Sequence, residues 1–222
     1  MVELLEQPSL AIIIDCWANN GYNSAQTKNY ENVLHNIAEQ IKNNEFIKSV
    51  AIASYANEGD FCSFEDQFIK NSLDFFVNET KWDILRNLWK NAKFGYDKDF
   101  FTHNIIKEIK FRDNQCVFSV FNNLDILYYC NFINPSIRNI YFFGQSWNVC
   151  VKDRPVGWLD VSTLNYHNLF SKKINLLTSK KCVFHPSVKD IQMDDYWTNI
   201  DNNICLLDES ADYFDKHDSL YL

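Results

Sequence analysis

Two stretches of the sequence decide the fold, LAIIID at residues 10–15 and IYFFGQSWNVCV at residues 140–151. Each begins as an apolar run without alternation, which is typical of a strand buried on both faces of a parallel sheet. The first run stops at Asp15 and the second stops at Gly144. Both stretches therefore predict central strands, each followed by a polar segment at the carboxyl edge of the sheet.

Further apolar patterns extend outward from these two strands. Helical spacing predicts a helix over residues 27–43, with Ser24 as its N-cap, and a second helix over residues 124–133 that ends before Pro135. Short apolar runs predict further strands at residues 50–53, 116–120, 174–178 and 204–207. Strands and helices thus alternate along most of the chain, as in α/β proteins.

This order predicts one domain over residues 1–222, with an irregular helical insertion near residues 57–104. We expect a three-layer α/β/α fold with a mainly parallel, Rossmann-like central sheet. Residues 10–14, 50–53 and 140–143 are the most continuously apolar runs, so we expect them to be adjacent in its centre.

Composition and charge exclude several classes of protein. The 222 residues are 46% hydrophobic and 23% charged, which is ordinary for a globular protein and excludes a disordered chain. The net charge of −8 argues against general nucleic-acid binding, since an acidic surface repels phosphates. No membrane-spanning run or basic secretion signal is visible, so we expect a cytoplasmic protein. An aromatic content of 16% favours a buried subunit interface and hence a homo-oligomer.

The cysteine pattern argues against two further kinds of structure. There are seven cysteines, irregularly spaced and without a CxxC pair, which argues against a disulfide framework and a zinc knuckle. Free thiols in a reducing compartment fit this pattern better. The histidines are too scattered for a metal set, and we expect neither a metal nor another cofactor.

Asp15 and Cys150 follow two of the predicted central strands, so both are expected at the carboxyl edge, where α/β sheets hold their sites. A cysteine at the start of a helix is activated by the free N–H groups and the positive dipole end, which also hold an oxyanion. A nearby carboxylate acts as general base. The alternative is a core thiol at Cys150 and a turn-capping role for Asp15, and spacing alone leaves both open.

The strand–Asp pattern and the strand–Gly–five residues–Cys–Val pattern together resemble the isochorismatase-like cysteine hydrolases. The extension CVxxRPxG, at residues 150–157, resembles one branch of that family. The resemblance implies the isochorismatase-like hydrolase fold and a triad of Cys, Asp and Lys. Carried onto this chain, Cys150 is the nucleophile and Asp15 is the base. It also implies a non-proline cis peptide bond, at Ser146–Trp147, that aims backbone N–H groups at the oxyanion.

The sequence departs from the family at the lysine, because none follows the strand at residues 116–120. The third member of the triad is therefore unassigned, and Lys93, Lys110, Arg112 or a neighbouring subunit are the possible sources of a cation. The region after the strand at residues 50–53 lacks the histidine of the zinc-dependent nicotinamidases, which disfavours that subgroup.

The substrate-binding candidates lie beside the cysteine. Asn148 stands where the family has an Asp, and Trp147 adds bulk near the thiol. Arg154 has the side-chain geometry to clamp a substrate carboxylate with two hydrogen bonds, or it pairs with Asp153 or Asp160, or it closes a subunit contact.

The leading interpretation is a cysteine-dependent hydrolase acting on a small-molecule substrate, at an amide or related C–N bond. The alternative is a catalytically inactive isochorismatase-like protein with a binding or assembly role, favoured by the missing lysine and by Trp147. An unrelated nucleotide-binding domain ranks last, since neither GxGxxG nor GxxxxGK[ST] occurs.

Overall fold

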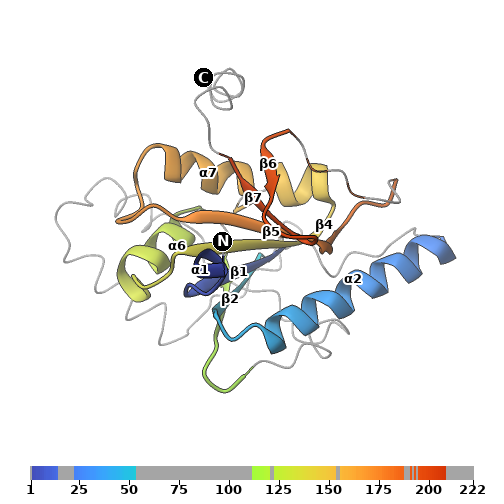
Figure 1. The fold of residues 1–222 in the computed structure, drawn as a ribbon, viewed down its shortest axis with the longest axis horizontal. Helices are drawn as coiled ribbons and strands as arrows, with labels where there is room; N and C mark the ends of the chain where they lie inside the picture. The colour runs from blue at the N-terminus through green and yellow to red at the C-terminus, as the bar shows by residue number, and fades with distance from the viewer. Residues whose placement is uncertain are drawn as a thin grey trace, which may run out of the picture.

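A seven-stranded mixed sheet organises the part of the chain that the structure describes (Figure 1). The computed structural model describes residues 2–14, 23–53, 112–120, 123–153, 156–187, 191, 193 and 195–208. The strands are β1 (Ser9–Ile14), β2 (Ile47–Ala53), β3 (Cys116–Val120), β4 (Asn139–Gln145), β5 (Asn175–Phe184), β6 (Trp197–Asn199) and β7 (Ile204–Leu207). Their order in the sheet is β3-β2-β1-β4-β5-β7-β6. The first five are parallel, and β7 and β6 add an antiparallel edge.

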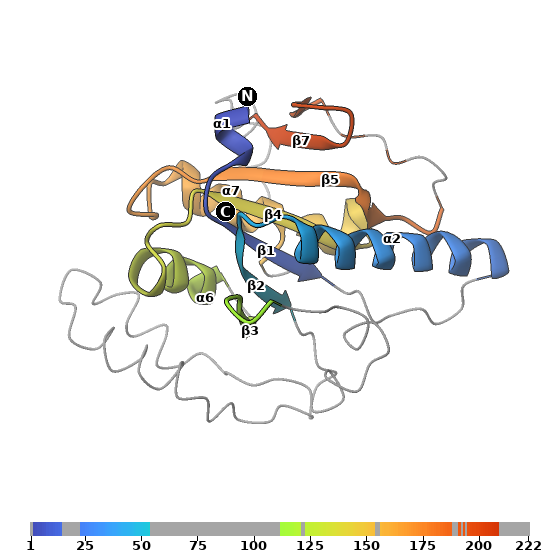
Figure 2. The same cartoon turned by 60° about the horizontal axis from the view of Figure 1, so that its bottom comes forward.

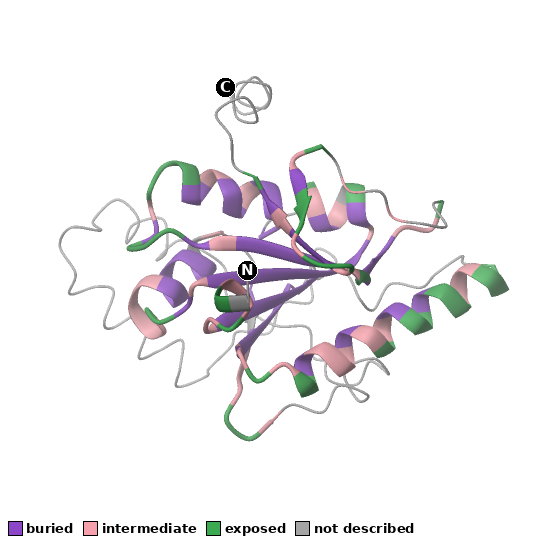
Figure 3. Cartoon of the chain, in the orientation of Figure 1, coloured by how far each residue is buried: buried purple, intermediate pink, exposed green. Residues whose placement is uncertain are grey.

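The centre of the sheet is the one expected from the apolar runs. β1 pairs in parallel with β2 on one side and with β4 on the other. Every residue of β1 and β4 is buried (Figure 3). Ile12 packs into the core on one face of the sheet and Ile13 into the core on the other, so neither face of β1 meets water. The predicted adjacency of the three runs and the mainly parallel sheet are confirmed.

Helices pack on both faces of this sheet. Helix α2 (Ser24–Asn43) buries Tyr30, Val33, Ile37 and Ile41 against one face. On the other face lie α6 (Asn123–Tyr128), its π-helical continuation η3 (Tyr129–Ile133), the π-helical turn η4 (Trp147–Val151) and α7 (Trp158–Tyr166). Figures 1 and 2 show α2 along one side of the sheet and α7 along the other, with the short α1 (Val2–Leu5) near one end.

Several boundaries differ from the sequence expectations. Helix α2 begins at Ser24, and its N-cap is Asn23, whose side chain accepts hydrogen bonds from the backbone N–H groups of Ala25 and Gln26. The Gln26 side chain bonds back to the Asn23 N–H, so a complete capping box displaces the predicted Ser24 cap.

Four strands are longer than predicted, since β1 begins at Ser9 and β2 at Ile47, and one strand was not predicted. β4 continues through Gly144 to Gln145, and β5 continues to Phe184. β6 has only three residues, two of them exposed, which is too short for a clear apolar pattern. The predicted insertion at residues 57–104 lies outside the described residues.

Candidate active site

Gly144 controls how closely the ends of β1 and β4 approach each other. It pairs with Ile14 in the sheet, and its φ of 125° is one that residues with a side chain rarely adopt. A Cβ atom at this position would lie 1.9 Å from the carbonyl oxygen of Ile14. Only glycine fits, so the absence of a side chain brings the end of β4 directly against the end of β1. Asp15, the residue after Ile14, lies outside the described residues.

The chain leaves β4 immediately after Gln145. The non-proline cis peptide bond joins Gln145 to Ser146, so the expected position, Ser146–Trp147, is wrong by one bond. The expectation had ended the strand at Gly144, whereas β4 runs on to Gln145, and the cis bond stands where the strand ends. A five-residue π-helical turn, η4, follows.

Cys150 is the fourth residue of η4, and its side chain is half-buried against the core on that face of the sheet. The wide turn is closed by the backbone N–H of Val151, which donates to the Ser146 carbonyl at 3.2 Å. Cys150 was expected at the start of an α-helix, and it lies in a π-helical turn that Lys152 and Asp153 continue as α-helix.

Trp147 anchors this turn in the core. It is 1% exposed, and its ring stacks against Trp158 with centroids 6.3 Å apart. Trp197 of β6 meets both rings edge-on, at 5.4 Å from each. The Trp147 ring, which was expected to add bulk near the thiol, is therefore packed in the core. The ammonium of Lys152 lies over the Trp158 ring, 5.7 Å from its centroid, as a cation–π contact.

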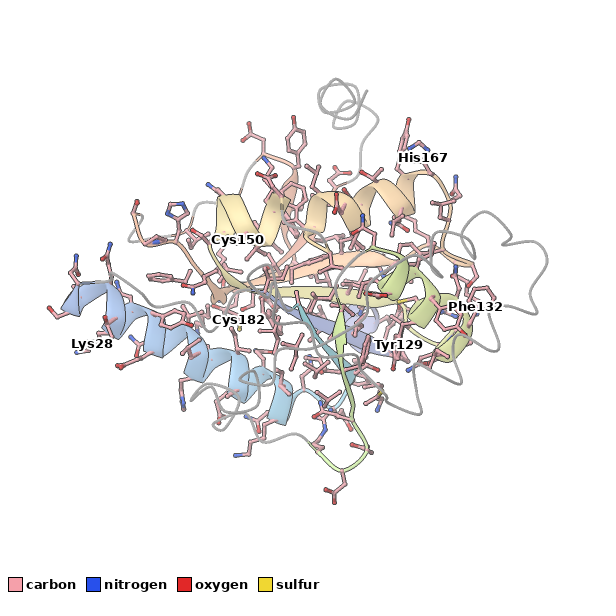
Figure 4. All side chains as sticks on the ribbon, turned by 180° about the vertical axis from the view of Figure 1, so that it is seen from behind. Lys28, Tyr129, Phe132, Cys150, His167 and Cys182 are labelled. Atoms are coloured by element: carbon pink, nitrogen blue, oxygen red, sulfur yellow. The ribbon has the colours of Figure 1, made fainter. Side chains whose placement is uncertain are left out.

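The remaining predicted site residues divide into two groups. Ser146 is half-buried and Asn148 is exposed to solvent on the same turn as Cys150. Asp15 and Arg154 lie outside the described residues. The structure therefore brings Ser146, Trp147, Asn148 and Cys150 together on one turn. Figure 4 places Cys150 on the same side of the molecule as Lys28 of α2, away from Phe132 and His167.

Arg112 is excluded as the missing cation of the triad. Its guanidinium donates to the backbone carbonyls of Lys42 at 3.0 Å, Asn44 at 2.8 Å and Ile47 at 2.6 Å. These carbonyls belong to the end of α2 and the start of β2, at the amino edge of the sheet, opposite the edge that carries Cys150. The two other candidates, Lys93 and Lys110, lie outside the described residues.

Asn123 lies just after β3, at the carboxyl edge of the sheet, and the sequence analysis did not single it out. Its side-chain oxygen accepts the Val156 N–H at 3.0 Å, and its side chain also hydrogen-bonds the Asp160 carboxylate. Val156 is buried and has a φ of 62°, a strained conformation for a β-branched residue. Asn123 thereby ties the start of α6 to the segment that follows the cysteine turn. Its only signal in the sequence is an Asn pair just after the third predicted strand.

Asp160 is the carboxylate that this arrangement perturbs. Burial raises the pKa of its side chain, the hydrogen bond from Asn123 lowers that pKa in part, and the negative charge of Asp153 raises it further. The group sits in the first turn of α7 and was considered in the sequence only as a possible partner for Arg154.

Across the described ranges, no three or more His, Cys, Asp or Glu side chains gather as a metal would require, and no helix there is long and apolar enough to cross a membrane. Comparison of the chain with known protein families, with curated proteins and with solved structures found no match.

Proposed function

We propose that the protein is a cysteine-dependent hydrolase that cleaves an amide or related C–N bond in a small molecule. The observation that carries the proposal is the position of Cys150. It is half-buried, on a short turn that leaves the central strand β4 at the carboxyl edge, directly beside the end of β1. The proposal includes the isochorismatase-like form of the α/β fold, on the sequence resemblance alone.

The reaction uses Cys150 as nucleophile and Asp15 as base. Asp15 takes the thiol proton as the sulfur attacks the carbonyl carbon, and backbone N–H groups of residues 146–150 stabilise the oxyanion. The C–N bond then breaks, and Asp15 passes the proton to the leaving nitrogen. Water next attacks the thioester and releases the carboxylic acid and the free thiol. Overall, one amide and one water give one acid and one amine.

Comparison with the other described cysteines supports Cys150 as the nucleophile. Cys130, Cys182 and Cys205 are buried, and burial raises the pKa of each thiol, to about 12 for Cys182. Such thiols stay protonated and inert near neutral pH. Cys116 is half-buried like Cys150 but lies at the first position of β3, away from the carboxyl edge.

The alternative is a non-catalytic protein that keeps this fold for binding or assembly. It is favoured by the engagement of Arg112 at the opposite edge of the sheet, which leaves the triad without a cation among the described candidates. The burial of Trp147 weakens the other argument for it, since the indole occupies the core. Five irregularly spaced free thiols in the described residues are consistent with a reducing, cytoplasmic environment in either case.

Iodoacetamide labelling, followed against pH by mass spectrometry, distinguishes the hydrolase from the non-catalytic protein. The hydrolase interpretation predicts that Cys150 labels first near neutral pH and that Asp15→Asn slows or shifts its profile. Cys116 is the matched control, because it is half-buried like Cys150. Labelling of Cys150 no faster than Cys116, with an apparent pKa near the ordinary ~8.5, would contradict an activated thiol.

A second measurement follows ammonia release from a panel of small primary amides. Cys150→Ser should abolish any turnover found, whereas Cys116→Ser should leave it within about twofold of wild type, because only an attacking thiol is needed for the acyl-enzyme. Turnover that survives Cys150→Ser would exclude this mechanism. A panel without any turnover, together with an ordinary thiol at Cys150, would favour the binding role.

A further inference from the structure

An open pocket of about 350 Å³ lies between the middle of α2 and the C-terminal half of β5, and it does not include the cysteine turn. Among the described residues, six polar ones line it: Asn29, Asn32, Asn36, Lys180, Lys181 and His185. Its apolar lining includes Val33 and Phe184. A volume near the lower end of the range for ligand sites suits a small molecule rather than a polymer.

A bulge in β5 creates the pocket. Phe142 and Gly144 of β4 are two residues apart, but their partners Thr178 and Val183 are five apart. The extra residues, which include Lys180 and Lys181, are therefore displaced from the ladder with β4. Bulges of this kind redirect side chains next to binding sites.

Helix α2 braces the displaced segment through its own polar side chains. The Asn36 side-chain amide donates to the Lys181 carbonyl at 3.0 Å, and the Gln26 side-chain amide donates to the Pro186 carbonyl at 2.7 Å. These bonds hold the backbone of the bulge and of the segment just after β5, so the pocket is formed without a ligand. A preformed site loses less free energy to ordering when it binds.

The lining is cationic although the chain is acidic. The protein carries a net charge of −8, yet among the described residues no Asp or Glu lines this pocket, and neither Lys180 nor Lys181 has an ion pair there. His185 accepts the Ser187 N–H at its Nδ1 atom, 3.2 Å away, so a neutral ring carries its proton on Nε2 as a donor.

The amides of the α2 wall add further donors. Within the described residues, the side chains of Asn29 and Asn32 make no hydrogen bond, so both are free to face a ligand. The described lining thus combines lysine, asparagine and histidine residues, whose side chains donate hydrogen bonds, with an apolar surface. The charged end of a ligand that matches this lining must be an oxyanion, and the remainder must be apolar.

We infer that this pocket binds a small organic anion, a carboxylate or phosphate ester with an apolar body. The carboxylate or phosphate lies between the lysines and the asparagines, and the apolar body packs on Val33 and Phe184. This inference does not depend on the proposed hydrolase activity, since Cys150 does not line the pocket. Phe184 pairs with Gln145, so the pocket adjoins the strand end from which the cysteine turn begins.

The test uses fluorine NMR titrations of the full chain with 4-fluorobenzoate, 4-fluorophenyl phosphate and the neutral 4-fluorobenzyl alcohol. Both anions should bind in the millimolar range or tighter, and the alcohol at least tenfold more weakly. Inorganic phosphate should compete only weakly, because it lacks the apolar body. Equal binding of the alcohol, or no anion binding at 20 mM, overturns the inference.

Variants locate the binding. The double substitution Lys180→Gln/Lys181→Gln should weaken anion binding at least tenfold, whereas Lys172→Gln/Lys173→Gln, an exposed tandem pair just before β5, should leave it within twofold. The second pair removes the same charge, so equal losses would mean a general surface effect and overturn the site.

An isosteric substitution tests the site independently of the lysine variant, which could misfold. Asn32→Asp adds a negative charge to the pocket from an exposed helical position and should weaken both anions at least fivefold. Asn202→Asp, at an exposed position in the turn before β7, is its control. Anion binding that is unchanged in Asn32→Asp would place the ligand elsewhere and overturn the inference.

Discussion

At the scale of single residues, Gly144 carries the closest contact at the candidate site. A Cβ atom there would meet the backbone carbonyl of Ile14 at 1.9 Å, in a conformation with φ of 125°. Gly144→Ala should therefore reduce the free energy of unfolding by about 2–5 kcal/mol, from backbone strain and from separation of β1 and β4. Urea denaturation followed by tryptophan fluorescence measures this loss.

A double variant provides the control for Gly144. Because the contact involves the backbone of Ile14, a smaller side chain there cannot relieve it. Ile14→Val should cost about 1 kcal/mol alone, and the double variant should be no more stable than Gly144→Ala. A Gly144→Ala protein within about 0.5 kcal/mol of wild type would contradict the geometry of the two strand ends.

Asp160 gives a prediction about pH. Its folded-state pKa lies above the ordinary 3.8, so the folded chain holds a proton that the unfolded chain has already released. The contribution of this group to stability therefore falls as pH rises from about 4 through the folded-state value. Asp160→Asn should gain stability relative to wild type between pH 3 and pH 7, and urea midpoints at both values measure the gain.

Asp160→Asn also removes a negative charge, and a control must show that this removal alone does not cause the pH-dependent gain in stability. Asp113→Asn provides the comparison, since Asp113 lies in an exposed turn at the opposite edge of the sheet. If Asp160→Asn shifts the urea midpoint equally at pH 3 and pH 7, the proposed proton linkage is wrong.

At the scale of elements, the N-cap of α2 differs between the sequence prediction and the structure. Asn23 accepts two backbone hydrogen bonds, and Ser24 is already inside the helix. Asn23→Ala should cost about 1 kcal/mol of stability, whereas Ser24→Ala should change it by less than about 0.5 kcal/mol. Thermal melts followed by circular dichroism measure both, and the reverse order of effects would restore Ser24 as the cap.

The elements that the sequence predicted are those whose signal is local. Residues 10–14, 116–120 and 140–143 are strands because continuous apolar runs leave no polar face for water. The extension of β4 to Gln145 and the π-helical form of the cysteine turn depend on tertiary contacts. Trp147 is held by Trp158 and Trp197, which lie far along the chain, and no local pattern encodes those contacts.

The candidate site was predictable to the same extent. Cys150 was found because its distance from Gly144 is a local pattern, and the structure keeps it on a turn just beyond β4. The role of Asn123 was not predicted, because its bonds to Val156 and Asp160 join segments more than thirty residues apart. Arg112 was misjudged because side-chain reach at the amino edge depends on where the end of α2 meets β2.

At the scale of the whole molecule, the expected homo-oligomer remains a prediction. Among the described residues, Tyr166 is the one large hydrophobic side chain that is exposed, at 41%. A dimer through the described surface would therefore use a mostly polar interface, which favours weak association. Sedimentation velocity should detect a dimer at tens of micromolar that dissociates on dilution, and a monomer throughout that range would contradict the expectation.

The order of the strands also predicts how the molecule opens. β1 and β4 each pair on both sides and are buried on both faces, whereas in the described sheet β6 pairs only with β7 and exposes two of its three residues. Amides of β1 and β4 should exchange with solvent only on global unfolding, at least about 100-fold more slowly than those of β6. Hydrogen exchange read by mass spectrometry measures both.

The Gly144→Ala variant tests whether the protection of the central strands is global. A loss of about 3 kcal/mol should accelerate exchange in β1 and β4 together by roughly 150-fold, because both exchange through the same unfolded state. Exchange in β6 should hardly change, since local opening of that edge does not require β1 and β4 to separate. Acceleration confined to β4, with β1 still protected, would mean that the two strands do not unfold as one unit, contrary to the contact that Gly144 makes with Ile14.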